Sequence, residues 1–193
     1  MIKNYNNTWG CLSEKQYVPN YNNTFKSSNE DLKVLEIGPG KGLLLPKIKQ
    51  IYGENNVYGM QPLNAEYSNE NKTLKSMFIN GNFIEDSLEN YVKSEYIQFD
   101  IIFIYKWNIS IQSKIEFIEA LNKIVKLNGI IYITCVEKER LYLTKKYEYM
   151  YILNDIQKYF NYTYPKEESI PNEPYLNYNY GSIKLKKLTL VYG

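Results

Sequence analysis

The residues best placed to do chemistry are an acidic residue and three alternate glycines near the start of the chain. Glu36 stands two positions before Gly38, and Gly40 and Gly42 follow, with Pro39 between the first two glycines. Glycine adopts positive φ and lets a ligand approach the main chain closely, and the first N–H groups of a following helix point toward such a ligand. The spacing predicts a strand that turns into a helix around a nucleotide-like ligand. A plain turn without a ligand is the alternative, but it would not need three glycines.

The spacing of the glycines separates two kinds of nucleotide-binding turn. A dinucleotide-binding turn has its third glycine three residues after the second, and this chain has Leu43 at that position. The pattern from Glu36 to Gly42 resembles instead motif I of the class I S-adenosylmethionine-dependent methyltransferases. The resemblance implies S-adenosylmethionine as the cofactor, S-adenosylhomocysteine as its product, and no metal. A nicotinamide-dependent dehydrogenase is the disfavoured alternative.

The rest of the chain supplies the elements that must position this motif. Apolar segments alternate with amphipathic ones, as in an α/β fold. Predicted strands cover residues 33–37, 56–60, 76–79, 99–104, 130–136, 160–164 and 182–191, and predicted helices cover 42–51, 65–74, 85–93, 112–126 and 143–159. We expect a three-layer Rossmann-like methyltransferase sandwich with a seven-stranded, mostly parallel sheet and an antiparallel last strand. Such sheets bind ligands at the carboxyl ends of their strands.

Two segments outside this alternation could cover a site. Residues 1–31 are polar and rich in Asn, and we expect an arm that is partly disordered or covers the site, followed by a methyltransferase-like domain over residues 32–193. The arm carries Tyr5, Trp9 and Tyr17. The second segment, at about 165–181, is also long for a simple connection, and such segments are often functional or disordered.

The resemblance extends to the segments around the second and third predicted strands. In the family, an acidic residue at the end of strand two accepts hydrogen bonds from both ribose hydroxyls, but this chain has Gln61, followed by Pro62. A neutral amide accepts more weakly than a carboxylate. The family often has an Asp after strand three that accepts from the adenine amino group, and here Asn82 aligns, with Phe83 beside the ring. An ordinary turn at Gly81-Asn82 is an equal alternative.

The residues after the fourth predicted strand align with the family's positions beside the methionine part of the cofactor and the methyl acceptor. Tyr105 is a candidate cofactor contact and a weak catalytic candidate, and Tyr105 and Trp107 fit the wall of an acceptor pocket. Because the chain has no His, a base would have to be Glu, Asp, Lys or Tyr. Lys106, Glu137 and Glu139 are better interpreted as solvated or structural residues. The family members that methylate amino groups of nucleic-acid bases or of protein glutamine carry an Asn/Asp-Pro-Pro-Tyr/Phe motif at this position. This chain lacks that motif, which argues against those substrates.

The length, composition and charge of the chain limit the expected cellular compartment and the expected classes of partner. The 193 residues suit one domain, no apolar run reaches the ~18 residues of a membrane span, and the first residues lack the apolar centre of a signal peptide. We therefore expect a cytoplasmic protein without a membrane partner. The formal net charge is only +2, and the lysines are dispersed, so a small-molecule acceptor is favoured over nucleic acid. The two cysteines show no metal-ligand spacing.

Two function hypotheses remain. The first is an S-adenosylmethionine-dependent methyltransferase that moves a methyl group to an unidentified oxygen or nitrogen atom, preferably of a small molecule. The alternative is a catalytically inactive methyltransferase-like protein that binds or scaffolds a protein partner. The alternative is motivated by Gln61 and Asn82, which stand in place of acids, and by the lack of an obvious base, but the methyltransferase is the leading hypothesis.

Overall fold

A computed structural model describes residues 18–25, 32–62, 68–79, 81–105, 114–136, 160–163 and 180–187. These residues confirm the α/β, Rossmann-like class. The strands lie in the order β3-β2-β1-β4-β5-β7-β6. Neighbouring strands from β3 to β5 pair in parallel, and β7 pairs antiparallel with β5 and β6. Their bounds are β1 Val34–Ile37, β2 Val57–Met60, β3 Phe83–Ile84, β4 Phe99–Ile104, β5 Val125–Val136, β6 Phe160–Thr163 and β7 Tyr180–Lys187.

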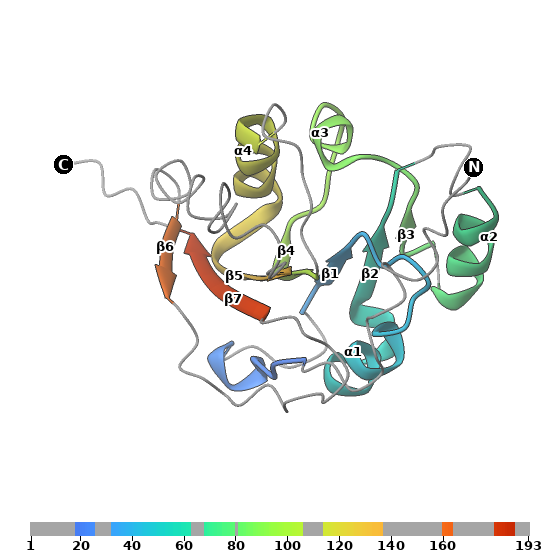
Figure 1. The fold of residues 1–193 in the computed structure, drawn as a ribbon, viewed down its shortest axis with the longest axis horizontal. Helices are drawn as coiled ribbons and strands as arrows, with labels where there is room; N and C mark the ends of the chain where they lie inside the picture. The colour runs from blue at the N-terminus through green and yellow to red at the C-terminus, as the bar shows by residue number, and fades with distance from the viewer. Residues whose placement is uncertain are drawn as a thin grey trace.

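Helices cover both faces of the sheet. Figure 1 shows α3 and α4 on one side, and α1 with residues 18–25 on the other. The helices are α1 Leu45–Tyr52, α2 Ser68–Met77, α3 Leu88–Tyr91 and α4 Lys114–Ile124, with short 3-10 turns at Asn22–Thr24 and Glu54–Asn56. Helix α1 has Pro46 in its first turn, where the N–H that proline lacks has no partner within the helix.

Each face of the sheet has its own apolar core, because successive side chains of a strand point to opposite faces. Leu35 of β1 packs with Met60 and with Phe117 of α4 in the core on the α3 and α4 side. Val34 packs in the other core, on the α1 side. The α1-side core is notably aromatic, with Tyr52, Phe78, Phe83, Phe103, Tyr105 and Tyr132.

Residues 18–25, here called the N-terminal segment, are fastened to α1. The Tyr52 hydroxyl donates to Pro19 O at 2.6 Å and accepts from Tyr21 N at 3.0 Å, and Asn22 Nδ2 donates to Ile51 O at 3.0 Å. Val18 is buried in the α1-side core. This part of the expected arm therefore packs on the domain, whereas residues 1–17 and 26–31 lie outside the described residues.

The predicted third strand is wrong. Residues 76–79 end helix α2 and enter the following turn, and β3 comes later, at Phe83–Ile84. The apolar run Met77, Phe78 and Ile79 resembles a strand in sequence. However, the Phe78 ring packs over Gly59 and stacks on Phe83, with ring centroids 5.5 Å apart. These tertiary contacts, rather than sheet pairing, explain why Phe78 is apolar.

The region between α4 and β5 also differs in detail. Helix α4 ends at Ile124, and Asn128 adopts a φ of 64° within the residues assigned to β5. The register between β4 and β5 shifts there and becomes regular from Ile130, the predicted start of the strand. The apolar side chain of Ile115 on α4 is 57% exposed. The predicted helix 143–159 lies outside the described residues.

Candidate functional site

The glycine turn follows β1 and lies against the end of β2. Gly38, Gly40 and Gly42 all have positive φ, of 68°, 57° and 71°. Each of their N–H groups is already satisfied within the protein. The acceptors are, in chain order, Met60 O at 2.8 Å, Gln61 Oε1 at 3.0 Å and Pro39 O at 2.9 Å. Turns that cradle phosphate do so with free backbone N–H groups, so the three glycine N–H groups of this turn are not available for that role. The expectation that the first N–H groups of the following helix face a ligand stays a prediction.

The three glycines have different roles. A Cβ atom added at Gly38 or Gly40 would meet no atom of the described residues within 4 Å, so these residues leave the turn open on that side. A Cβ atom at Gly42 would lie 2.8 Å from Met77 Sδ and 3.1 Å from Leu74 Cδ2. Gly42 is thus needed for the packing of α2 against the turn, whereas Gly38 and Gly40 leave room for a ligand to reach the main chain.

Glu36 places a carboxyl group inside the protein next to this turn. It lies opposite Phe103 in the register between β1 and β4 and is 1% exposed. Its Oε2 atom is buried and has no hydrogen-bond partner among the described residues. Burial raises the pKa of Glu36 from the usual 4.5 to about 8. A nearby positive charge would favour the ionised form and give this oxygen a partner, so the residue suits a cationic ligand.

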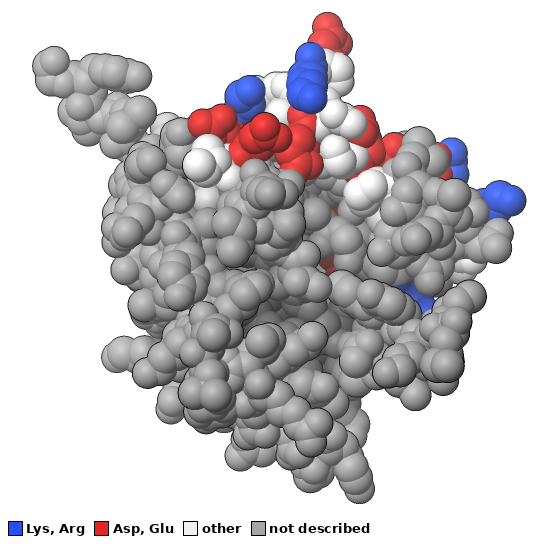
Figure 2. All heavy atoms as spheres, turned by 45° about the horizontal axis from the view of Figure 1, so that its top comes forward, with Lys and Arg blue, Asp and Glu red and all other residues white. Residues whose placement is uncertain are grey.

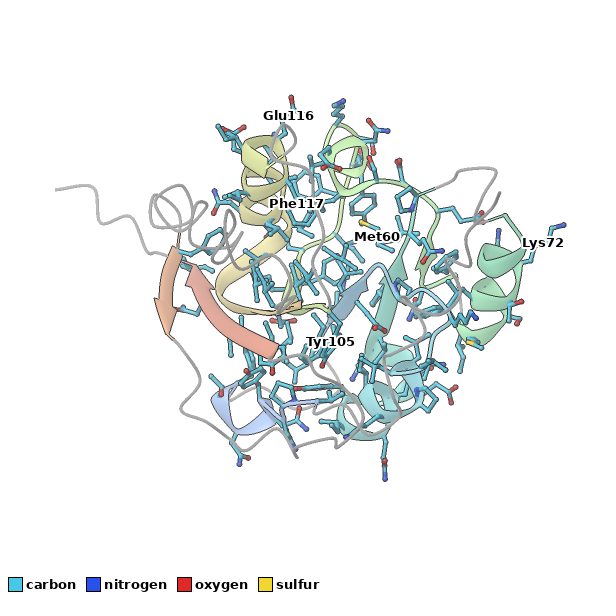
Figure 3. The ribbon with its side chains drawn as sticks, in the orientation of Figure 1. Met60, Lys72, Tyr105, Glu116 and Phe117 are labelled. Carbon is cyan, nitrogen blue, oxygen red and sulfur yellow. The ribbon has the colours of Figure 1, made fainter. Side chains whose placement is uncertain are left out.

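Tyr105 follows β4 directly and lies on the same side of the sheet. Its ring stacks on Phe103 at 5.8 Å between centroids and is tilted against Tyr132 at 6.0 Å. Figure 3 shows it between the sheet and the layer of α1 and the N-terminal segment. Burial, and next the charge of Glu36, raise the pKa of Tyr105 well above its usual value. A phenol held in its protonated form can donate a hydrogen bond, but it is unsuited to the role of base.

Gln61 and Pro62 lie where the sequence predicted, at the end of β2 beside the glycine turn. Gln61 N donates to Ile84 O at 3.1 Å, which joins the ends of β2 and β3. The Gln61 side chain is 4% exposed, and its amide oxygen accepts from Gly40 N–H. Pro62 is exposed. The structure therefore brings both residues to the turn, with the Gln61 side chain bonded to the turn itself.

Asn82 and Phe83 lie elsewhere. Asn82 precedes β3, and its side-chain amide donates to Asn55 O at 2.9 Å and to Val57 O at 3.3 Å. Because Val57 begins β2, these bonds hold Asn82 at the amino end of that strand, away from the glycine turn. Phe83 is 8% exposed and packs in the core on the α1 side. The sequence analysis placed the third strand at residues 76–79, so that Asn82 and Phe83 would follow its carboxyl end. In the structure Asn82 precedes β3 and Phe83 begins it.

The acids at the carboxyl end of β3 were missed by the sequence prediction. Glu85 and Asp86 directly follow β3, and Ser87 caps helix α3 by accepting from Asn90 N at 3.3 Å. Asp86 Oδ1 accepts from Ser87 N at 2.8 Å. The carboxyl ends of parallel strands meet at one edge of the sheet, so Asp86 is on the edge that carries the glycine turn. The signal in the sequence was the apolar pair Phe83-Ile84, followed by acids and a capping serine.

Other candidates fall outside the described residues. These are Tyr5, Trp9, Tyr17, Lys106, Trp107, Glu137 and Glu139. In the part of the chain that is described, no group of three or more His, Cys, Asp or Glu side chains could hold a metal ion. None of the described helices combines the length and the apolar character needed to cross a membrane.

Comparisons with known proteins identify the fold. No protein-family model matches the chain, and no curated protein matches its sequence. A candidate rRNA methylase from Clostridium thermocellum superposes with a TM-score of 0.58 at 15% identity, over 90% of this chain and 98% of that one. The plantazolicin methyltransferase BamL, solved with S-adenosylhomocysteine, gives a TM-score of 0.58 at 16% identity, over 80% and 76% of the two chains.

A third solved structure points the same way. A candidate methyltransferase from Streptococcus mutans, in complex with S-adenosylhomocysteine, gives a TM-score of 0.53 at 12% identity, over 83% of this chain and 93% of that one. The chain thus has the fold of the class I S-adenosylmethionine-dependent methyltransferases, and the resemblance indicated by its glycine motif is confirmed. At these identities the likeness establishes the fold, and the activity has to be argued from the site.

Proposed function

We propose that this chain is an S-adenosylmethionine-dependent methyltransferase. The observation that carries the proposal is the glycine turn, which is open at Gly38 and Gly40 while its glycine N–H groups are all satisfied. Beside it, Glu36 holds a buried carboxyl oxygen that has no hydrogen-bond partner in the described part of the chain. This arrangement suits a ligand that approaches the main chain closely, carries positive charge and lacks phosphate. S-adenosylmethionine has these properties, whereas a nicotinamide dinucleotide carries a pyrophosphate.

The residues at the sheet edge have distinct proposed roles. Gly38, Pro39 and Gly40 would admit the cofactor to the main chain, and Glu36 would provide the counter-charge for its cationic part. Asp86, in place of Asn82, would accept from the adenine amino group, because it follows β3 at the same sheet edge. The bound cofactor supplies a methyl group already activated on a sulfonium, so the protein's contribution is mainly to align the acceptor.

The acceptor is proposed to be an oxygen or nitrogen atom of a small molecule. Tyr105, with its raised pKa, would line the acceptor side and donate a hydrogen bond rather than remove a proton. The face that carries α3 and α4 shows Asp and Glu side chains gathered with a few lysines (Figure 2), including the exposed Glu116 and Glu119. Such a face does not attract a phosphate backbone, which supports the small-molecule class.

The domain boundaries are part of the proposal. Residues 32–193 would form one three-layer methyltransferase domain, whose seven-stranded sheet ends with β6 and the antiparallel β7. The arm of residues 1–31 would cover it, as the contacts of the N-terminal segment with α1 suggest.

A non-catalytic role is the second candidate. It is favoured by Gln61, whose neutral amide stands where an acid would hold the ribose and is engaged by Gly40. A methyltransferase-like subunit of this kind would scaffold a protein partner without using the cofactor. Cofactor binding separates the two candidates.

Calorimetric titration with S-adenosylmethionine, S-adenosylhomocysteine and NAD tests the proposal. We expect micromolar binding of the first two and none of NAD. Gly40→Arg should abolish binding by filling the open side of the turn. Gly81→Arg is the matched control, because Gly81 also has positive φ, of 75°, and no atom of the described residues within 4 Å of its Cβ position, but lies in the turn before β3. Absence of binding to folded wild-type protein would reject the cofactor and favour the scaffold.

The class of acceptor is tested separately. Purified protein with methyl-labelled S-adenosylmethionine would be incubated with a low-molecular-mass cell extract and, in parallel, with total RNA. Label in the small-molecule fraction, lost in Gly40→Arg, is the expected result. Label incorporated into RNA would contradict the small-molecule proposal while supporting the methyltransferase activity.

A further inference from the structure

Gln61 holds the glycine turn in shape. Among the described residues, Gly38 and Gly40 of this turn each donate a backbone hydrogen bond to the end of β2. One runs from Gly38 N to Met60 O at 2.8 Å, and it uses only the backbone. The other runs from Gly40 N to Gln61 Oε1 at 3.0 Å, and it depends on the side chain at position 61.

The described residues give the turn no packing support on its open side. None of their atoms lies within 4 Å of a Cβ position at Gly38 or Gly40, and both glycines have positive φ, although glycine populates negative φ about as readily. The bond to Gln61 is therefore a main restraint on Gly40. Loss of the acceptor would leave the Gly40 N–H without this partner and free the turn to change conformation.

The burial of Gln61 indicates which way its side chain acts. Only 4% of Gln61 is exposed. A side chain that binds a ligand directly in an open site would instead present its polar end to solvent in the ligand-free protein. Its amide oxygen faces the turn. The side chain supports the turn from the protein side, and Gly38 and Gly40 face the open side.

We propose that Gln61 is a positioning residue for the glycine turn, acting on cofactor affinity through Gly40 rather than by holding the ribose hydroxyls. The inference rests on the proposed cofactor. It assigns the ribose to other groups of the site, and it gives Gln61 a role in the ligand-free protein as well.

The neutral amide has a physical reason in this setting. Glu36 lies opposite Gly59 in the register between β1 and β2, and Gln61 follows Gly59 by two residues. Alternate residues share one face of a sheet, so a carboxylate at position 61 would add a second acid on the face that already buries the unpartnered oxygen of Glu36. An amide makes the bond to Gly40 N–H without that additional charge.

Two variants and two ligands test the inference. Gln61→Met keeps the length of the side chain but removes the acceptor, and Gln61→Glu keeps an acceptor. Calorimetry would use S-adenosylhomocysteine and its 2′-deoxy analogue. We expect Gln61→Met to weaken both ligands by the same factor of about tenfold. Gln61→Glu keeps the acceptor but adds a charge near Glu36, so it should weaken the deoxy analogue less than Gln61→Met does. A loss that is clearly larger for S-adenosylhomocysteine than for the deoxy analogue would show that Gln61 holds the ribose, and would overturn the inference.

Amide hydrogen exchange in the ligand-free protein tests the inference without the cofactor. Gln61→Met should speed exchange at Gly40 by about tenfold or more, leave Gly38 unchanged because its bond is to Met60 O, and be rescued by Gln61→Glu. Equal exchange at Gly40 in wild type and Gln61→Met would overturn the inference. If the wild type binds no S-adenosylhomocysteine but shows the expected exchange, the proposed cofactor fails and the role of Gln61 in the turn stands.

Discussion

The buried carboxyl of Glu36 leads to a prediction about stability. Glu36→Gln replaces the carboxyl with a neutral amide of nearly the same size. Because burial raises the pKa of Glu36 from 4.5 to about 8, the folded state binds more protons than the unfolded state between these two values. The free energy of unfolding of the wild type should therefore fall as pH rises through this range. The variant lacks this contribution.

The magnitude follows from the two pKa values. One pH unit between them corresponds to about 1.4 kcal/mol. Linkage with pKa values of 4.5 and about 8 predicts that the wild type loses about 2.5 kcal/mol between about pH 5 and pH 7, and about 4 kcal/mol by about pH 9. Since folded domains have only about 5–15 kcal/mol of stability, this effect is large. The free energy of unfolding of Glu36→Gln minus that of the wild type should rise by the same amount.

Urea unfolding of both proteins at several pH values measures this difference in the free energy of unfolding. Taking the difference cancels the contribution of the other titrating groups, which the two proteins share. Glu116→Gln, at an exposed position of α4, is the matched control, and its difference from the wild type should stay within about 0.5 kcal/mol. If the difference between Glu36→Gln and the wild type were independent of pH, Glu36 would not be a buried carboxyl without a partner, and the reasoning about a cationic ligand would lose its basis.

Three further predictions follow from the same structure. S-adenosylmethionine affinity should increase as pH rises toward about 8, because binding of a cation favours ionised Glu36, and calorimetry should find this dependence absent in Glu36→Gln; an unchanged profile would contradict the pairing. Gly42→Ala should destabilise by about 2–4 kcal/mol in urea unfolding, from overpacking against Met77 added to strain at positive φ, whereas Gly38→Ala should cost only about 1 kcal/mol; equal losses would refute the separate roles. Tyr52→Phe should lower stability by about 1–2 kcal/mol and expose the N-terminal segment to proteolysis, and an unchanged cleavage pattern would show that the Tyr52 hydroxyl does not hold this segment on α1.

The sequence predicted the parts of the fold that local pattern controls. The runs that became β1, β2 and β4 are mainly apolar on both faces, with Glu36 and Asp100 as the charged exceptions, and such a pattern is typical of a strand buried between two helical layers. The glycine turn was predicted from its spacing, because positive φ restricts the choice of residue at Gly38, Gly40 and Gly42. Gln61 and Pro62 were placed correctly for the same reason, since they follow a well-defined strand. The boundaries of β3 were not predictable in this way, because it has only two residues and its apolar neighbours on α2 gave a stronger pattern.

The sequence by itself determined the α/β class, the glycine turn and the strand ends that flank it, because these depend on residue types at short spacing. Tertiary structure decided which atoms are available for function. The Met77 and Leu74 side chains of α2 pack against Gly42 and leave no space for a side chain there. The Gly40 N–H group, which the sequence alone leaves available to a ligand, donates to Gln61. Asn82 was drawn to the amino end of β2 by the carbonyls of Asn55 and Val57. Burial, hydrogen-bond pairing and pKa depend on neighbours that are distant in sequence, so only the folded chain could assign them.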